Sequence, residues 1–178
     1  MNPFKEFSLP IKGLKNGYHT FNFQIDHTFF THFESSPIQN GIFDVTVEMD
    51  KRDSFFELTF DFDGTMQTEC DRCTASIELP FGDTQMLIVK MSEDVQDEDA
   101  DVVFISPDAH EFNVAQYIYE FICLAEPLHK VYDCENDDPR PCDFDILDKI
   151  KPPTASEDTT EDSLKNPFQD LKNLFNKN

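Results

Sequence analysis

The alternation of apolar and polar side chains in the N-terminal half constrains the fold of this chain most strongly. Apolar residues recur at alternate positions within residues 21–25, 43–49, 56–62 and 77–81. This period is typical of β-strands with one buried and one exposed face. Turn-forming residues separate the segments at 35–37, 50–53, 63–64 and 82–83. Short connections favour antiparallel neighbours, so the pattern predicts an antiparallel, meandering sheet.

The apolar face of this sheet is rich in phenylalanine, which accounts for 19 of the 178 residues. That face must be covered, either because the sheet curls toward a barrel or because helices pack on it. Residues 114–122 carry apolar side chains at helical spacing, with Asn113 before them as an N-cap and Pro127 after them. A helical turn within residues 27–33 and a short helix after Cys142 are also expected. We predict an α+β fold, in which one main helix covers a curved, barrel-like antiparallel sheet and a Cys-containing C-terminal segment follows.

The composition changes along the chain and suggests where the domain ends. Residues 1–150 are expected to form the α+β domain, with an acidic loop at 92–101 that contains the run EDVQDEDAD. Residues 151–178 are expected to form a flexible linker and a short amphipathic tail. The tail carries apolar side chains on one predicted helical face, at Phe168, Leu171, Leu174 and Phe175.

The net charge of −22, from 36 acidic and 14 basic residues, limits the class of partner. Each phosphate contact on a nucleic acid requires a basic side chain, so direct capture of bare RNA is disfavoured and a basic protein partner is favoured. Lys12 and Lys15 form a locally positive segment that either faces a partner or only aids solubility. The chain shows no secretory signal and no long apolar stretch, so we expect a cytoplasmic protein that does not enter a membrane. Its five cysteines are then expected to be reduced.

The sharpest local motif is the sequence Cys70-Asp71-Arg72-Cys73. Two cysteines at this spacing can share one metal ion, and Cys134 and Cys142 would complete a four-cysteine structural zinc site. His129 is an alternative fourth ligand. Buried thiols without a metal are the competing interpretation, so zinc stays an open prediction. If zinc is bound, Arg72, which lies between two of the ligands in the sequence, would either form a structural ion pair or face a partner.

The same motif also occurs in thiol oxidoreductases. In those proteins the pair lies at the N-terminus of a helix that follows a strand, where the helix dipole lowers the thiol pKa. Here the flanking residues 65–69 and 74–81 resemble two strands of a hairpin, which disfavours that activity. Neither the H-E-x-x-H nor the G-x-S-x-G pattern occurs, so no catalytic residue is predicted.

The order of these features resembles a known family. The N-terminal segment IKGLKNGYHTFNFQID precedes a β-rich region that closes on Cys70, Arg72 and Cys73, and an acidic run, a helix and the late cysteines Cys134 and Cys142 follow. Over roughly residues 5–150 the chain resembles the YceD-like family, the large ribosomal RNA subunit accumulation proteins, in a form typical of the Bacteroidetes. One departure is the gap of seven residues in the second cysteine pair, which is tighter or missing in many members.

The resemblance implies a cytoplasmic, non-enzymatic ribosome-biogenesis factor that supports accumulation of large-subunit (23S) ribosomal RNA. Combined with the acidic charge, it suggests binding to a large-subunit precursor or to a basic ribosomal protein rather than to bare RNA. Two alternatives stay open: a zinc-stabilised interaction module with an unrelated partner, and a C-x-x-C thiol oxidoreductase.

Overall fold

The computed structural model describes residues 3–93, 102–134 and 138–150. The chain divides into two compact units, residues 1–143 and residues 144–178. Apart from residues 92 and 93, the predicted acidic loop lies outside the described residues, as do the predicted linker and tail. Within the described ranges, no helix is long and apolar enough to cross a lipid bilayer.

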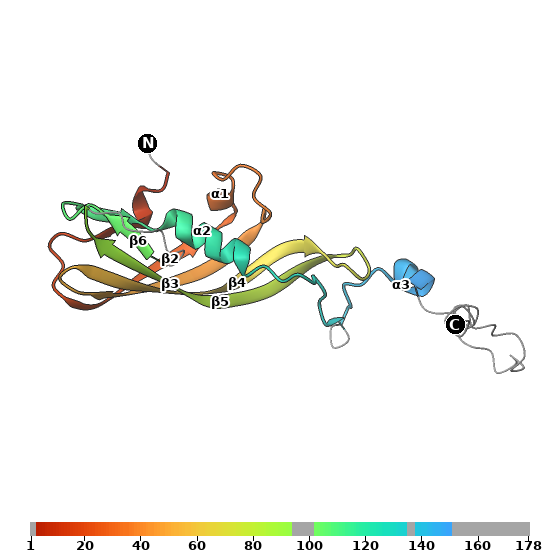
Figure 1. Cartoon of the computed structure of the whole chain (residues 1–178). Coiled ribbons are helices and arrows are strands. Elements are labelled where there is room, and N and C mark those ends of the chain that lie inside the picture. Colours follow the sequence, from red (N-terminus) through yellow and green to blue (C-terminus); the bar gives the residue numbers. More distant parts are fainter. Residues whose placement is uncertain (1–2, 94–101, 135–137, 151–178) are drawn as a thin grey trace, which may run out of the picture. The chain divides into compact units, whose positions relative to one another are not determined.

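The first unit is built on a five-stranded sheet with the order β2-β3-β4-β5-β6 (Figure 1). Strands β2 to β5 are sequential antiparallel neighbours, which confirms the predicted meander. The strands are β2 (Gly17–Ile25), β3 (Gly41–Lys51), β4 (Phe55–Glu69), β5 (Ser76–Met91) and β6 (Val102–Ile105).

The predicted barrel-like closure is wrong. Strands β2 and β6 lie at opposite edges of the sheet, and β6 runs parallel to β5 rather than antiparallel. Closure is not needed, because α2 (Ala115–Leu124) packs over the apolar face, on the same side of the sheet as α1 (His27–Phe30) (Figure 1). The α+β class is confirmed.

Contact between α2 and the sheet forms the centre of the core. Ile118 and Ile122 of the helix are 1% and 0% exposed, and Phe60 of β4 is 0% exposed. The rings of Phe60 and Phe121 meet edge to face, with centroids 5.1 Å apart. Full burial of one such apolar side chain contributes about 1.5–3 kcal/mol, so the phenylalanine-rich strands supply much of the driving force for folding.

The ends of α2 lie close to the predicted positions, although Val114 rather than Asn113 is the N-cap residue. The Asn113 side-chain oxygen accepts a hydrogen bond from the Ala115 N–H at 3.1 Å, and the helix ends at Leu124, before Pro127. Asn113 also donates its side-chain N–H to the Phe4 carbonyl at 2.6 Å. It thereby ties the helix start to the N-terminal segment, which contains a 3-10 turn η1 (Lys5–Phe7) and strand β1 (Ser8–Pro10). Strand β1 pairs antiparallel with β7 (Glu111–Asn113).

The predicted turns at residues 63–64 and 82–83 are wrong, because β4 and β5 run straight through them. Gly64 of β4 lies directly opposite Phe43 of β3 and Phe81 of β5. The two phenylalanine rings approach each other edge to face, with centroids 5.0 Å apart. A Cβ atom on Gly64 would lie 2.2 Å from the Ile42 carbonyl oxygen. Glycine is therefore needed here for close approach of the strands rather than for a turn.

In the second unit, α3 (Phe144–Ile150) confirms the helix expected after Cys142. Its apolar residues Phe144 and Ile150 are 53% and 55% exposed.

Candidate functional site

The Cys70–Cys73 motif forms the turn of the β4–β5 hairpin, as its flanking strands predicted. Two backbone hydrogen bonds close the turn, from the Cys70 N–H to the Ala75 carbonyl and from the Thr74 N–H to the Cys70 carbonyl, both 2.8 Å long. Thr74 adopts a left-handed conformation, with φ of 56°. This tight turn directs both cysteines inward, and they are only 3% and 1% exposed.

The Cys70 sulfur lies among backbone donors. Burial opposes its ionisation, but hydrogen bonds from the N–H groups of Arg72, Cys73 and Tyr132 and from the Cys73 side chain hold the pKa of Cys70 below its ordinary value. Donors that face a sulfur in this way stabilise negative charge on it. The Cys70 thiol is therefore more acidic than an ordinary cysteine thiol.

The chain that follows α2 is joined to this turn by a reciprocal pair of hydrogen bonds. The Asp71 N–H donates to the Lys130 carbonyl at 2.9 Å, and the Lys130 N–H donates to the Asp71 carboxylate at 2.7 Å. Tyr132 adds its backbone N–H to the Cys70 sulfur. These contacts hold the segment up to Cys134 against the hairpin turn.

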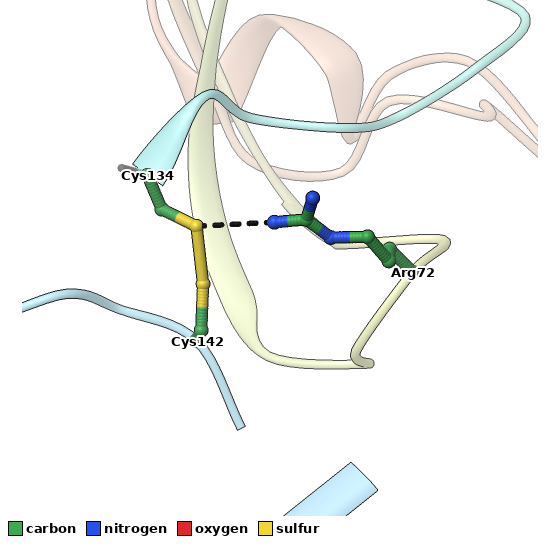
Figure 2. Close-up of a disulfide and its surroundings, with 3 residues drawn as sticks. All are labelled: Arg72, Cys134 and Cys142. Atoms are coloured by element: carbon green, nitrogen blue, oxygen red, sulfur yellow. Dashed lines mark hydrogen bonds between the residues drawn. A yellow bond between two sulfur atoms is a disulfide. The ribbon is translucent and has the colours of Figure 1, made fainter. Parts of the chain in front are cut away.

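Arg72 points toward the second pair of cysteines. Its guanidinium Nη2 donates to the Cys134 sulfur at 3.3 Å, and Figure 2 shows this contact together with the disulfide between Cys134 and Cys142. The expectation that all five cysteines are reduced is therefore wrong for Cys134 and Cys142. Their Cα atoms lie 6.9 Å apart, slightly beyond the usual range for a disulfide. Cys70, Cys73 and Cys123 are free.

Only some of the cysteines at this site are available as ligands for a zinc ion. Cys70 and Cys73 are free thiols on one tight turn and would supply two of the four ligands that a structural zinc site requires. The sulfurs of Cys134 and Cys142 are bonded to each other, and reduction is needed before they can serve as thiolate ligands. Within the described ranges, no group of three or more His, Cys, Asp or Glu side chains is arranged to hold a metal ion. His129, the alternative ligand, is exposed.

The predicted partner-facing lysines do not join this site. Lys12 and Lys15 precede β2, whose first residue Gly17 pairs with Lys51 at the end of β3. The hairpin turn lies beyond the opposite end of β3, where Gly41 pairs with Met66. Lys12 instead approaches Asp108, with 3.4 Å between its Nζ and the carboxylate. Arg72 and the two lysines therefore belong to different parts of the first unit.

Sequence reasoning missed the residues that hold the two cysteine segments together. Asp71, Lys130 and Tyr132 act through backbone groups and one carboxylate, and Asp71 and Lys130 are 59 positions apart in the sequence. No periodicity or motif signals such a contact. The hairpin context of Cys70 and Cys73 was the only pointer to where a second segment could dock.

Comparison with known proteins identifies the family. The family model described as "Large ribosomal RNA subunit accumulation protein YceD" matches residues 58–175, more than half of the chain. The match begins within β4 and includes all four cysteines of the candidate site. No curated protein and no solved structure matches the chain. The chain belongs to the YceD family of large ribosomal RNA subunit accumulation proteins.

Proposed function

We propose that this protein is a cytoplasmic, non-enzymatic ribosome-biogenesis factor that supports accumulation of the large-subunit (23S) ribosomal RNA. The family match over residues 58–175 carries this proposal. The proposed mode of action is binding to a large-subunit assembly intermediate or to a basic ribosomal protein, which protects the RNA indirectly.

The charge of the chain supports a protein partner rather than bare RNA. At a net charge of −22, long-range repulsion opposes approach to a phosphate backbone. The same charge accelerates encounter with a basic protein, and such encounter weakens as salt screens it. Binding to the partner is therefore expected to fall steeply with ionic strength.

The direct test is deletion of the gene, followed by measurement of 23S against 16S ribosomal RNA and of free subunits on sucrose gradients. We expect a selective loss of 23S RNA and of the large subunit, restored by the wild-type gene. Unchanged ratios during both normal and cold growth would contradict the proposal.

A second function, favoured by the hairpin turn, is a zinc-stabilised interaction module with an unrelated partner. In its reduced form the chain offers Cys70, Cys73, Cys134 and Cys142 as ligands. The backbone donors around the Cys70 sulfur favour thiolate character there. Zinc would supply folding free energy rather than chemistry, by joining the hairpin turn to the segment after α2.

The zinc proposal is tested on protein purified under reducing conditions without chelators. We expect about one zinc per chain by mass spectrometry in the wild type, as for a closed structural site, and loss of zinc in Cys70→Ser. Cys123→Ser is the matched control, because Cys123 is a free, half-buried cysteine of α2 outside the motif. Zinc retained in Cys70→Ser, or absent from the wild type, would refute the site. Disulfide-reducing turnover lost in Cys70→Ser would instead favour the oxidoreductase.

A further inference from the structure

The face of the sheet that points away from α1 and α2 is termed here the outer face. Side chains of directly paired residues share a face of a sheet, and successive residues alternate. The strand register therefore places Asp44 of β3, Asp63 of β4 and Thr84 of β5 on the outer face. Within the described part of the first unit, no helix covers this face (Figure 1).

The outer face is strongly acidic. Within strands β2 to β6, Lys90 is the only basic side chain at an outer-face position. The acidic residues at outer-face positions are Asp44, Glu48, Asp50, Glu57, Asp61, Asp63, Glu69 and Glu78. The outer-face positions of these strands therefore carry eight carboxylates and one ammonium group.

Two cross-strand pairs on this face place like charges opposite each other. Asp44 lies directly opposite Asp63, and Asp50 lies directly opposite Glu57. Opposed like charges destabilise a sheet. Arg52 donates to Asp50, and the Gln24 side chain donates to Asp44 at 3.2 Å. These contacts relieve the repulsion only in part, so a cation from outside would stabilise the arrangement further.

An apolar patch lies on the same face, over β4, β5 and β6. Phe55, Lys90 and Phe104 occupy one row across these strands, and the Lys90 Nζ lies 5.9 Å from the centre of the Phe104 ring. Ile88 and Val102 occupy the next row, and Met86 adjoins it. Met86 is 55% exposed and Phe55 is 39% exposed. Exposed apolar side chains that are rimmed by charge are typical of interaction surfaces.

We propose that the outer face binds a cationic, amphipathic segment of a partner polypeptide. The apolar side chains of that segment would cover the patch formed by Phe55, Met86, Ile88, Val102 and Phe104, and its lysines and arginines would pair with the carboxylates. Charge complementarity selects this occupant, because a second copy of the chain or an RNA would bring further negative charge to the face. This inference rests on the proposed function in one respect, which is that the basic partner is a ribosomal protein.

The electrostatic part is tested with the full-length protein and a fluorescein-labelled synthetic helical peptide of leucine and lysine. The triple variant Glu48→Gln, Glu57→Gln, Asp63→Asn removes three outer-face carboxylates with little change in shape. The matched control Glu6→Gln, Glu34→Gln, Glu111→Gln changes the net charge equally, at exposed positions outside β2 to β6. At about 0.15 M ionic strength we expect the outer-face variant to bind the peptide about tenfold more weakly than the control variant.

The apolar part is tested with Met86→Gln, Ile88→Thr against the control Leu124→Gln, Leu128→Gln. The control residues are 78% and 95% exposed and lie at and beyond the end of α2. We expect the patch variant to bind at least fivefold more weakly than its control, since loss of two apolar contacts is worth about 1 kcal/mol or more. Circular dichroism and urea unfolding would show that each variant is folded.

Equal peptide binding by the outer-face variants and their controls would overturn the proposal, whatever the ribosomal RNA ratios are. A dimer of the wild type that is lost in Met86→Gln, Ile88→Thr would overturn it in favour of a second copy. Binding of a labelled 23S RNA fragment that the outer-face variants lose would overturn it in favour of RNA. Selective peptide loss together with unchanged 23S RNA in the deletion strain would support the surface and reject the ribosomal partner.

Discussion

Replacement of Gly64 by alanine tests why β4 contains a glycine at its centre. A Cβ atom at this position would lie 2.2 Å from the Ile42 carbonyl oxygen, 2.5 Å from Phe43 Cδ1 and 2.7 Å from Phe43 Cα. Two of these three atoms are backbone atoms, so rotation of a side chain does not relieve the clash. Strands β3 and β4 must move apart at this point, against a spacing of about 4.8 Å that their hydrogen bonds set.

The loss of stability follows from the contacts that separation of the two strands would break. Loss of one or two ladder hydrogen bonds costs about 1 kcal/mol each, and overpacking of the Phe43 ring adds about 1–3 kcal/mol. We therefore expect Gly64→Ala to lower the free energy of unfolding by about 3 kcal/mol. With a urea m-value of about 2 kcal/mol/M, the midpoint should fall by about 1.5 M.

The matched control is Thr65→Ala, which changes the next residue of β4 at an exposed, outer-face position. We expect it to lower stability by no more than about 1 kcal/mol, as surface strand positions do. If Gly64→Ala unfolds within about 0.5 M urea of the wild type at an unchanged m-value, close strand approach is not what requires glycine here.

Three further predictions concern a turn, a helix cap and a half-buried phenol. Thr74→Gly should raise the free energy of unfolding, measured in urea, by about 0.5 kcal/mol. Relief of the left-handed φ of 56° outweighs the entropy that glycine adds to the unfolded chain. Thr74→Val, in contrast, should not raise the free energy of unfolding. Asp26→Ala should cost about 1 kcal/mol in the same assay, because Asp26 caps α1 by accepting the Thr28 N–H at 2.8 Å, whereas Asp26→Asn should keep most of the cap. Burial, with a smaller contribution from the Glu120 carboxylate, raises the pKa of Tyr117 above its usual 10.0. The neutral phenol therefore contributes to the free energy of unfolding fully below about pH 10, and this contribution is lost as the pH rises through the raised pKa. Between about pH 9 and 11, the free energy of unfolding in urea should therefore fall less for Tyr117→Phe than for the wild type. An equal fall with pH in the two proteins would refute this pKa shift.

Local patterns predicted the elements of this fold well, because each depends on neighbours in sequence. The alternation of apolar residues predicted the meander, and Asn113 and Pro127 marked the boundaries of α2. The predicted turns at Gly64 and Gly82 do not form, because glycine permits a turn and a close strand approach equally. Sheet closure was misjudged because an apolar face does not reveal whether a helix or the sheet itself covers it.

The candidate site was predicted in part for the same reason. Cys70 and Cys73 were identified from their spacing and placed correctly on a hairpin. The contacts of Asp71 with Lys130 and of Arg72 with Cys134 join segments that lie far apart in sequence. They arise from the path that the chain takes after α2, which no local pattern encodes. The disulfide is not predicted, because the lack of a secretory signal favours a reducing compartment.

The strand order has a consequence for how the family region should be handled in the laboratory. The family match begins at residue 58, within β4, which pairs with β3 on one side and with β5 on the other. A polypeptide starting at that residue would lose its neighbour strand, and a long row of unpaired amides and carbonyls would face water. Such open edges recruit other chains and lead to aggregation. The N-terminal strands are thus an integral part of the sheet, and we expect the matched region to aggregate when it is expressed by itself.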